Sequence, residues 1–324
     1  MRRRVKFRVR SSKFQVAFVA FIGVVTLAAA PPQAPANTTS SPYAGLIYFD
    51  RLETTPRAVH LHVVQIDLTT PGLRFALSPP GGAKEVVRQT TLEYLNATHA
   101  QVAINAHYFL PYPTTETDVE VIGLAVSDGR VISGFETPVQ RYALVTDAPA
   151  INLDASNRAS IVHRDTGNTS VAAVRERVTL WTAVAGSAQI VTDGKVTIPM
   201  YADATHPTAD LVAGGPGNYS NERSWYVVSN ARTAIGLSRD ARTLTLFTAD
   251  ARGGSAGLTV AEVATRLIRD FGVWNALNLD GGGSTSMAME DPLTHIGRLV
   301  NVSSDSPAGR AVGTNLAVFV PHQH

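Results

Sequence analysis

The chain has 324 residues, of which 44% are hydrophobic and 17% are charged, a composition that excludes a mainly disordered protein. Seven of its 28 Lys and Arg lie within residues 1–13, and none of its 26 Asp and Glu precedes residue 37, so residues 37–324 carry 21 cations against 26 anions. This net charge of −5 argues against nucleic acid as a partner. The absence of cysteine excludes disulfides and thiolate chemistry.

The N-terminus has the three parts of a secretion signal. A cationic segment to Lys13 precedes an apolar run over residues 14–30, and a Pro-rich stretch of small residues follows. We therefore interpret residues 1–36 as a signal peptide or, because the 17-residue run is just long enough to span a bilayer, as an N-terminal anchor. Both alternatives predict a secreted or periplasmic body, with membrane contact only through an uncleaved N-terminus.

Beyond this leader, residues 37–58 are expected to form a linker and the start of the body, and residues 59–324 a single globular domain. Alternating apolar residues over 59–67, then Pro71-Gly72 and residues 73–77, predict a β-hairpin or meander. The other elements expected before residue 257 are a short helix over 91–97, strands at 102–109, 123–132, between 141 and 198, and at 224–229, 231–238 and 243–250, and a long loop over 199–224.

The clearest helix signal begins at Thr259. Thr259 and Glu262 form a Thr-x-x-Glu capping box, apolar residues then recur on one face, and Gly272 marks the C-terminal end. A short buried strand is expected at 275–280. Many strands and few helices predict an α+β fold, with a mixed, strand-rich sheet and a few packed helices.

Three glycines follow Asp280 directly at the end of this last strand. Gly281, Gly282 and Gly283 could turn several N–H groups toward one anion, and the hydroxyls of Ser284 and Thr285 could add donors. The alternative is a flexible tight turn. A P-loop, a Gly-x-Ser-x-Gly elbow and a His-Glu-x-x-His motif are all absent from the sequence.

The nine histidines form no recognisable metal-binding motif in the sequence. His60 and His62 stand two positions apart, which predicts that they face one side of a strand. We interpret this pair as one that does not bind metal.

Five blocks of sequence, taken in order, resemble the phosphodiester glycosidase family. The most specific is the Asn-Leu-Asp-Gly-Gly-Gly-Ser segment after the capped helix. The blocks are VAINAHYF at 102–109, GLAVSDGRVI at 123–132, ARTAIGLS at 231–238, residues 257–287, and VNVSSDSPAGRAVGTNLAVF at 300–319. The resemblance implies hydrolysis of a sugar-1-phosphodiester, such as an N-acetylglucosamine-1-phosphodiester, between the anomeric carbon and the phosphate oxygen.

A phosphate leaving group is already a weak base, so this reaction needs groups that hold an anion and deliver water more than it needs an acid. The resemblance assigns catalysis to Asp280, as base or nucleophile or holding a cation, and to Arg232, which can pair with phosphate through two hydrogen bonds. For each, the alternative is structural: Arg232 in an ion pair and Asp280 as a cap of the glycine turn.

The same resemblance suggests further substrate-binding residues. These are Asn105, His107, Asn278, Gly281, Gly282, Gly283, Ser284, Thr285 and Arg310. The asparagines suit sugar hydroxyls or buried backbone groups, His107 suits specificity or acid catalysis, and Arg310 suits either a second cation near the anion or a structural ion pair. No cofactor is assigned, although a divalent cation bridging Asp280 and phosphate stays open, with its other ligands unknown.

The expected function is therefore a glycosidase acting on a small or polysaccharide sugar-phosphate substrate in extracellular or envelope glycans. Two alternatives from other classes keep the same anion site. One is an envelope protein that binds a phosphorylated glycan without turnover, and the other is a phosphodiesterase that cuts the P–O bond.

Overall fold

The computed structural model describes residues 37–135, 145–211, 213–214 and 218–321, so the predicted leader lies outside the described residues. Within these ranges, two α-helices and one 3-10 turn accompany 21 strands. Every pairing between these strands is antiparallel. The prediction of a strand-rich domain is confirmed. The mixed sheet and the α+β class are wrong, because most strands are joined without the crossover helices that parallel pairing requires, and the fold is mostly β.

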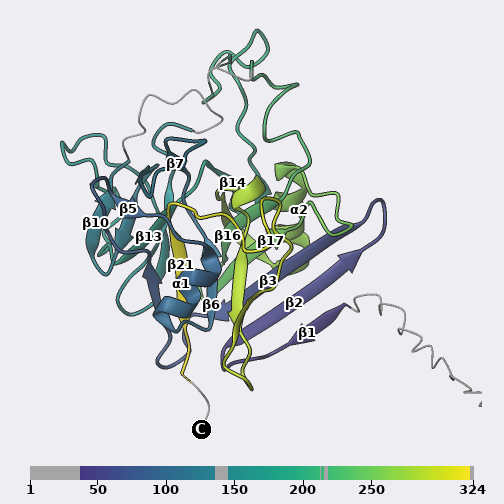
Figure 1. Ribbon diagram of the computed structural model, residues 1–324. Coiled ribbons are helices and arrows are strands. Elements are labelled where there is room, and N and C mark those ends of the chain that lie inside the picture. The colour runs from purple at the N-terminus through teal and green to yellow at the C-terminus, as the bar shows by residue number, and fades with distance from the viewer. Residues whose placement is uncertain (1–36, 136–144, 212, 215–217, 322–324) are drawn as a thin grey trace, which may run out of the picture. The chain divides into compact units, whose positions relative to one another are not determined.

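An eight-stranded sheet forms the largest element and includes residues expected to be a linker. Its spatial order is β1-β2-β3-β17-β16-β18-β14-β15. The strands are β1 (Thr38–Ser40), β2 (Leu46–Glu53), β3 (Val59–Asp67), β14 (Ala188–Thr192), β15 (Lys195–Val196), β16 (Arg232–Ser238), β17 (Thr243–Ala249) and β18 (Val273–Asn278). Figure 1 shows β1, β2 and β3 side by side at one end of this sheet.

Three smaller sheets complete the described body. One has the order β10-β9-β13-β11-β12, another β20-β19-β6-β21-β4, and a third β5-β8-β7. The strands are β4 (Arg74–Leu77), β5 (Val86–Val87), β6 (Val102–Asn105), β7 (Phe109–Leu110), β8 (Asp118–Val121), β9 (Ala125–Ser127), β10 (Arg130–Ser133), β11 (Ala150–Leu153), β12 (Ala159–Val162), β13 (Thr182–Ala185), β19 (Met287–Glu290), β20 (Gly297–Leu299) and β21 (Asn315–Phe319).

Both helices begin at a capping box and end at a residue in the left-handed conformation. Helix α1 (Thr91–Thr98) packs on β6, β19, β20 and β21, and α2 (Val260–Phe271) packs on β14, β15, β16 and β18. Thr259 and Glu262 bond reciprocally at the start of α2, and Gly272 has a φ of 66° at its end, as the sequence predicts. The buried face of α2 covers its own apolar core, while a larger core lies between the sheets.

The register of three central strands brings two aspartates to one edge of the large sheet. Ala234 of β16 pairs with Phe247 of β17 on one side and with Asn278 of β18 on the other. Because both neighbours are antiparallel to β16, β17 and β18 run in the same direction. The residues that follow them, Asp250 and Asp280, therefore leave the sheet at the same edge, where β16 begins.

Three predicted elements differ from the structure. Strands β3 and β4 lie in different sheets, so residues 59–77 are not a hairpin, because each strand buries its apolar face against distant partners. The segment 224–229 forms turns rather than a strand. Residues 102–109 divide into β6 and β7, and the long loop over 199–224 has no named helix or strand among its described residues.

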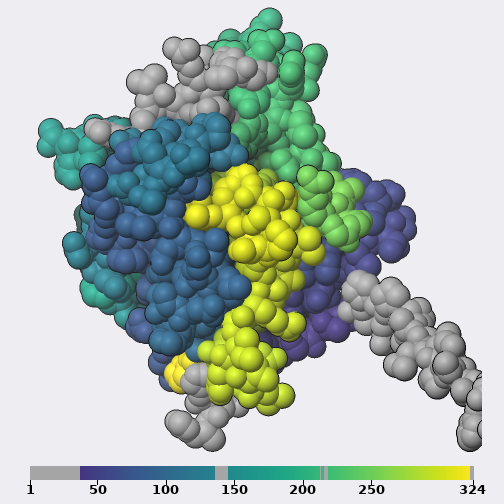
Figure 2. All heavy atoms as spheres, in the orientation of Figure 1, coloured from purple at the N-terminus to yellow at the C-terminus, as the bar shows by residue number. Residues whose placement is uncertain are grey.

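Residues 300–314, between β20 and β21, lie at the surface of the described residues. Figure 2 shows this segment in yellow between the blue residues around α1 and the green residues that follow β17. A Cβ atom at Gly253 would lie 3.1 Å from a methyl of Val302, so the segment after β17 contacts the segment after β20. No helix in the described part of the chain is both long and apolar enough to cross a membrane.

Candidate active site

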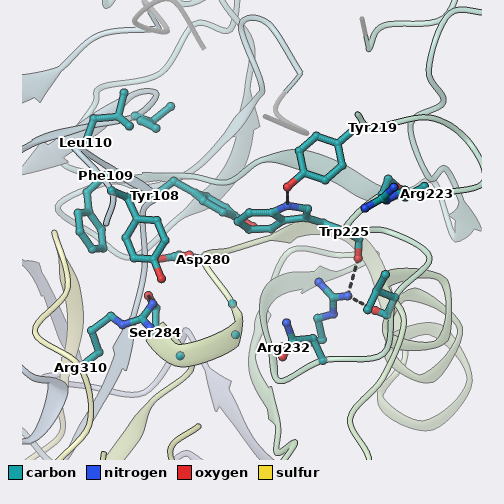
Figure 3. Close-up of a pocket in the computed structure, with 18 residues that line it drawn as sticks. Tyr108, Phe109, Leu110, Tyr219, Arg223, Trp225, Arg232, Asp280, Ser284 and Arg310 are labelled. Carbon is teal, nitrogen blue, oxygen red and sulfur yellow. Dashed lines mark hydrogen bonds between the residues drawn. The ribbon is translucent and has the colours of Figure 1, made fainter. Parts of the chain in front are cut away.

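A pocket of about 470 Å³ lies at the edge of the sheet where β18 ends. Asp280 and the glycine turn form one wall. Arg223, Arg232 and Arg310 also line the pocket, and Arg232 and Arg310 are the two that the sequence singled out. Figure 3 shows the glycine turn passing between these two arginine side chains. The structure thus brings together both residues that the sequence assigned to catalysis.

Aromatic residues form much of the remaining wall. Tyr108 comes from the segment after β6, whereas Tyr219 and Trp225 come from the region of the long loop. The rings of Tyr108 and Trp225 lie 5.9 Å apart, and the Trp225 indole N–H donates to the Tyr219 hydroxyl. Flat apolar faces with polar edges suit sugar rings, whose axial hydrogens and hydroxyls need both kinds of contact.

The main chain of Asp280 is fixed by the strand next to it in space. Its N–H donates to the carbonyl of Ala106 at 3.0 Å, and its carbonyl accepts from Asn105 Nδ2 at 2.7 Å. These bonds place the carboxylate at the mouth of the glycine turn, where the side chain is only 7% exposed. The position of Asp280 is therefore set before any ligand binds.

Burial dominates the electrostatics of this carboxylate. Desolvation raises the pKa of Asp280 to about 7, and the Ser284 hydroxyl, the Arg310 charge and the Gly281 N–H only partly oppose that rise. A group that titrates near neutrality can take up and release a proton during a reaction. Among the described residues that line the pocket, Asp280 is the sole carboxylate, so a divalent cation here would have one protein carboxylate as ligand.

One N–H group of the predicted anion nest is already bonded within the protein, and the turn is closed by two further N–H groups. The N–H of Gly282 donates to Ala231 O at 2.8 Å, that of Ser284 to Gly281 O at 3.1 Å, and that of Thr285 to Gly282 O at 3.2 Å. These bonds close a 3-10 turn over Gly282–Ser284. The Gly282 N–H is therefore not available to an anion as predicted, while Gly281 to Ser284 line the pocket and the rest of the nest stays a prediction.

Close packing of Arg310 gives the glycines a different purpose. A Cβ atom at Gly283 would lie 2.1 Å from Arg310 Nη2, and Gly282 has a φ of 60°. Arg310 Nη1 donates to Ser284 Oγ at 3.4 Å, while Nη2 contacts Asp305 at 2.7 Å. Arg310 thus has both roles that the sequence left open, because it is in an ion pair and also lines the pocket.

Arg232 is held by carbonyl oxygens instead of an acid. Its Nε donates to Leu258 O at 2.9 Å, and its Nη2 donates to Trp225 O at 2.5 Å and to Val228 O. No carboxylate of the described residues lies within 4.0 Å of the guanidinium, which contradicts the structural ion pair. Burial lowers the pKa of Arg232, but an arginine keeps its charge at such a site, so the pocket wall carries a cation without a counter-ion.

Three predicted substrate-binding residues lie behind the pocket. Asn105 is fully buried, with Thr233 Oγ1 and the Ser286 N–H donating to its Oδ1. Asn278 Nδ2 donates to Ser187 Oγ at 2.9 Å and to the Tyr108 hydroxyl at 3.2 Å. The side chain of Thr285 is buried and bonds to Thr233. None of the three is among the pocket-lining residues, so their contacts position Asp280 and Tyr108 instead.

His107 is also buried away from the pocket. Its Nδ1 contacts Thr314 Oγ1 at 2.8 Å, and its Nε2 accepts from the Ala185 N–H at 3.0 Å. Burial lowers the pKa of His107 to about 4, which keeps the ring neutral. The prediction that it shapes specificity or acts as an acid is therefore wrong, since a fully enclosed neutral ring cannot reach a ligand.

Sequence reasoning missed the aromatic wall. Tyr108 is the second-last residue of the VAINAHYF block, and Trp225 lies in a segment whose apolar residues resemble those of a strand. A cluster of tyrosine and tryptophan next to a Gly- and Asn-rich loop was the available signal, because loops at a site often supply its binding residues.

Comparisons with known proteins identify the family. The model of the phosphodiester glycosidase family matches residues 98–319. N-acetylglucosamine-1-phosphodiester alpha-N-acetylglucosaminidase from Mus musculus is 27% identical over 274 residues, which cover 81% of this chain and 46% of the mouse protein. The chain thus spans about half the length of that curated relative.

Solved structures of similar fold agree with this match. The zebrafish N-acetylglucosamine-1-phosphodiester alpha-N-acetylglucosaminidase catalytic domain, auto-inhibited by its pro-peptide, has a TM-score of 0.59 and 19% identity and covers 90% of this chain and 86% of its own. A hypothetical protein from Synechocystis gives 0.57 with 18% identity, covering 89% and 64%. A putative exported protein from Burkholderia pseudomallei gives 0.53 with 18% identity, covering 83% and 76%. At these identities the likeness shows the fold alone, and the match to the family model over residues 98–319 shows that this chain belongs to the phosphodiester glycosidase family.

Proposed function

We propose that the chain hydrolyses the bond between the anomeric carbon of a sugar and the oxygen of a phosphodiester, in extracellular or envelope glycans. One observation carries this proposal. A single buried carboxylate with a pKa near 7 shares an aromatic pocket with three arginines, Arg223, Arg232 and Arg310. Arginine suits phosphate and the aromatic faces suit a sugar, so the pocket matches a substrate that has both parts.

One carboxylate is sufficient for this reaction because of the nature of its leaving group. Ordinary glycosidases need a second carboxyl group to protonate an alkoxide. A phosphodiester sugar releases a phosphate monoester, which leaves with the electron pair of the C–O bond and needs no proton. Arg310, which contacts Ser284 beside the turn, can stabilise the charge that accumulates on that phosphate.

Asp280 then serves as the base. Its carboxylate takes a proton from water while the water oxygen bonds to the anomeric carbon and the phosphate departs. A pKa near 7 is well matched to this step, because the ionised form is populated at neutral pH and is still basic enough to accept the proton. A base that activates water predicts inversion at the anomeric carbon.

The setting and the sugar are the finer parts of the proposal. The mouse and zebrafish relatives are named for an N-acetylglucosamine-1-phosphodiester, which makes that sugar the first to test. The leader signals in residues 1–36 and the exported Burkholderia neighbour support a location outside the cytoplasm.

The test is product analysis in oxygen-18 water, with the full chain, UDP-N-acetylglucosamine and the methyl ester of N-acetylglucosamine 1-phosphate. Free sugar carrying the label on its anomeric oxygen is expected, and proton NMR during the reaction should show the inverted anomer first. Label on phosphate would replace the proposal with a phosphodiesterase. Retention of the anomer would make Asp280 the nucleophile. Tight binding of both compounds without any product would indicate a glycan-binding protein.

A further inference from the structure

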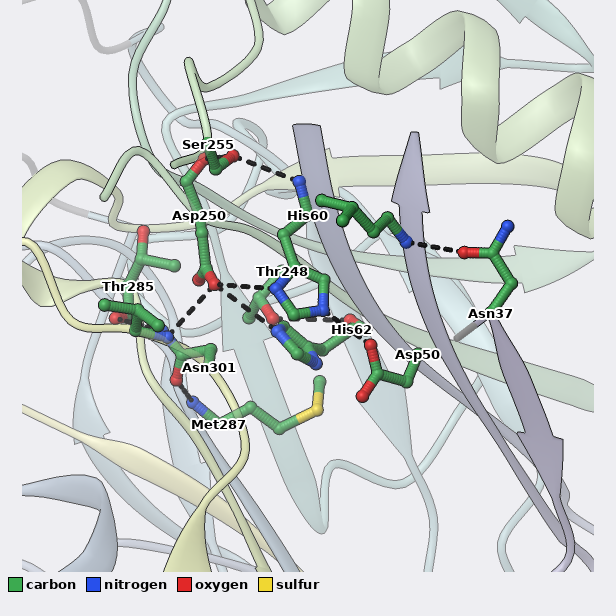
Figure 4. Close-up of polar contacts among 12 residues, drawn as sticks. Asn37, Asp50, His60, His62, Thr248, Asp250, Ser255, Thr285, Met287 and Asn301 are labelled. Carbon is green, nitrogen blue, oxygen red and sulfur yellow. Dashed lines mark hydrogen bonds and ion pairs between the residues drawn. The ribbon is translucent and has the colours of Figure 1, made fainter. Parts of the chain in front are cut away.

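A second group of ionisable side chains lies at the same sheet edge, outside the pocket. His60 and His62 project from one side of β3, with their ring centroids 4.2 Å apart, as their spacing predicts. Asp50 of β2 pairs with His62 in the strand register, and Asp250 follows the end of β17. Figure 4 shows the four side chains pointing toward one another. We call them the histidine–aspartate cluster.

The contacts within the cluster are those of potential metal ligands. His60 Nε2 lies 2.5 Å from Asp50 Oδ1, and His62 Nε2 lies 3.4 Å from Asp250 Oδ2. His60 Nδ1 lies 3.8 Å from the same Asp250 oxygen. One ligand atom from each of Asp50, His60 and His62 can be chosen so that all lie within 4.8 Å of one another.

The charge of the cluster is poorly compensated by the protein. Asp250 is fully buried, and its Oδ1 has no hydrogen-bond partner among the described residues. Neither Asp50 nor Asp250 forms an ion pair with a lysine or arginine of the described chain; their ionic contacts are with the two histidines. A buried carboxylate oxygen without a partner is costly, and a bound cation removes that cost.

In place of the sequence interpretation that His60 and His62 do not bind metal, we propose that the histidine–aspartate cluster binds one divalent transition-metal ion of the Zn²⁺ class. Two imidazoles and the Asp50 carboxylate form a nitrogen and oxygen ligand set of that class, with the Asp250 carboxylate beside them, whereas Mg²⁺ and Ca²⁺ prefer oxygen alone. Ligand atoms around a tetrahedral Zn²⁺ lie about 3.3 Å apart, so the 3.4 Å between His62 and Asp250 already fits. The His60 to Asp50 contact lengthens by roughly 0.8 Å on binding.

The surroundings of the cluster support this assignment. The Tyr48 hydroxyl lies 2.8 Å from His62 Nδ1, so this nitrogen can donate while Nε2 stays free to ligate, an arrangement typical of metal-binding histidines. The His62 and Asp250 side chains are buried, but His60 and Asp50 are 17% and 30% exposed. An ion can therefore enter from the Asp50 side and reach enclosed ligands.

The role of the metal is structural. The Val302 N–H donates to Asp250 Oδ2 at 3.1 Å, and the neighbouring Asn301 Nδ2 donates to Thr285 O at 3.2 Å. The ion would thus link β2 and β3 to the segment that leads to Arg310. This proposal does not depend on the proposed glycosidic reaction, because its readout is metal binding.

The test uses the full chain, stripped with a chelator and then titrated with Zn²⁺ in competition with a chromophoric chelator. One equivalent should bind per chain and raise Tm, and Co²⁺ should give the visible absorption of a four-coordinate site. His60→Ala and Asp50→Asn, both partly exposed, should each weaken Zn²⁺ binding at least 100-fold while the protein stays folded.

His163→Ala is the matched control. His163 lies 2.8 Å from Glu176, an imidazole and carboxylate pair outside the cluster, so its loss should leave the bound equivalent unchanged. The proposal would be overturned by wild-type protein that binds no stoichiometric Zn²⁺, by an unchanged equivalent in His60→Ala and Asp50→Asn, or by an equal loss in His163→Ala.

Discussion

Two aspartates follow neighbouring strands to the same sheet edge, yet their surroundings differ. Asp250, after β17, is fully enclosed and meets two histidines and a backbone N–H. Asp280, after β18, is 7% exposed, opens into a pocket and meets a hydroxyl, a backbone N–H and the field of an arginine. The first arrangement groups ligands around a point inside the protein, and the second leaves one side of the carboxylate to a substrate.

The two sites show that the end of a strand fixes where a carboxylate lies, whereas the residues that follow the strand determine what the carboxylate contacts. After β17, the chain turns so that Asp250 faces β3. After β18, the glycines let Arg310 approach within the space a side chain would occupy, and they leave the carboxylate facing the pocket. The variants below test whether the two aspartates differ in function as they differ in surroundings.

The largest expected effect is that of Asp280→Asn on turnover. Losing a general base typically costs a factor of about 10² to 10⁴, and we expect kcat to fall by about 10³. The measurement is release of free sugar from the methyl ester substrate. Asp240→Asn, at an exposed turn of the same sheet, is the control and should keep turnover within about twofold. Near-normal activity in folded Asp280→Asn would remove this residue from the mechanism.

Arg232→Ala should come next. It removes a buried cation of the pocket wall, with an expected loss in kcat/KM of about 10². It also leaves the carbonyls of Leu258, Trp225 and Val228 without their donor, which should lower the free energy of unfolding by about 1 to 3 kcal/mol. Urea unfolding measures the second effect. Arg232→Lys keeps the charge but not the fork of donors, so recovery of most activity in that variant would show that charge alone matters.

Gly283→Ala should lower kcat/KM by roughly tenfold, because a Cβ there displaces Arg310 from Ser284. Arg310→Ala should give a similar loss, and the double variant should be little worse than either, since both act on one contact. Additive losses in the double variant would mean that Gly283 acts through the turn and not through Arg310.

The sequence predicted much of this arrangement and missed the rest for physical reasons. Capping residues and strand alternation are local, so α1, α2, β3 and β18 were predicted close to their observed bounds. Asp280 and Arg232 were both assigned through the resemblance to the phosphodiester glycosidase family, in which the glycine block is the specific signal.

Contacts distant in sequence were beyond such reasoning. The burial of His107 depends on β13 and Thr314, and the ligands around His60 and His62 include an aspartate 188 residues from His62. The prediction for the Gly282 N–H failed because the spacing of glycines does not reveal that Ala231 already accepts this group.

The pH dependence of activity tests the carboxylate directly. A base must be ionised, so kcat/KM should rise with pH through an apparent pKa of about 7 and then level off. In Arg310→Ala the rising part of this pH profile should move to higher pH, because the guanidinium lowers the pKa of Asp280. An unchanged apparent pKa in this variant would show that Arg310 does not act on the Asp280 carboxylate.

The smallest effect concerns stability, and it separates the two aspartates. The pKa of Asp280 is raised from 3.8 to about 7 by folding, so the folded protein binds the proton more tightly than the unfolded chain does. As pH rises from about 4 to about 7, the unfolded chain ionises first, and the protein loses stability until both states are ionised. Asp280→Asn removes that loss, so its Tm should exceed that of the wild type by a few degrees at pH 8 and match it at pH 4.

Asp250→Asn should lower Tm at pH 8 instead, because the amide is a poorer acceptor for the Val302 N–H and the His62 ring. A lower Tm for both variants at pH 8 would mean that Asp280, like Asp250, is retained for structure, whereas a gain at Asp280 alone identifies the carboxylate whose burial serves the reaction at the expense of stability.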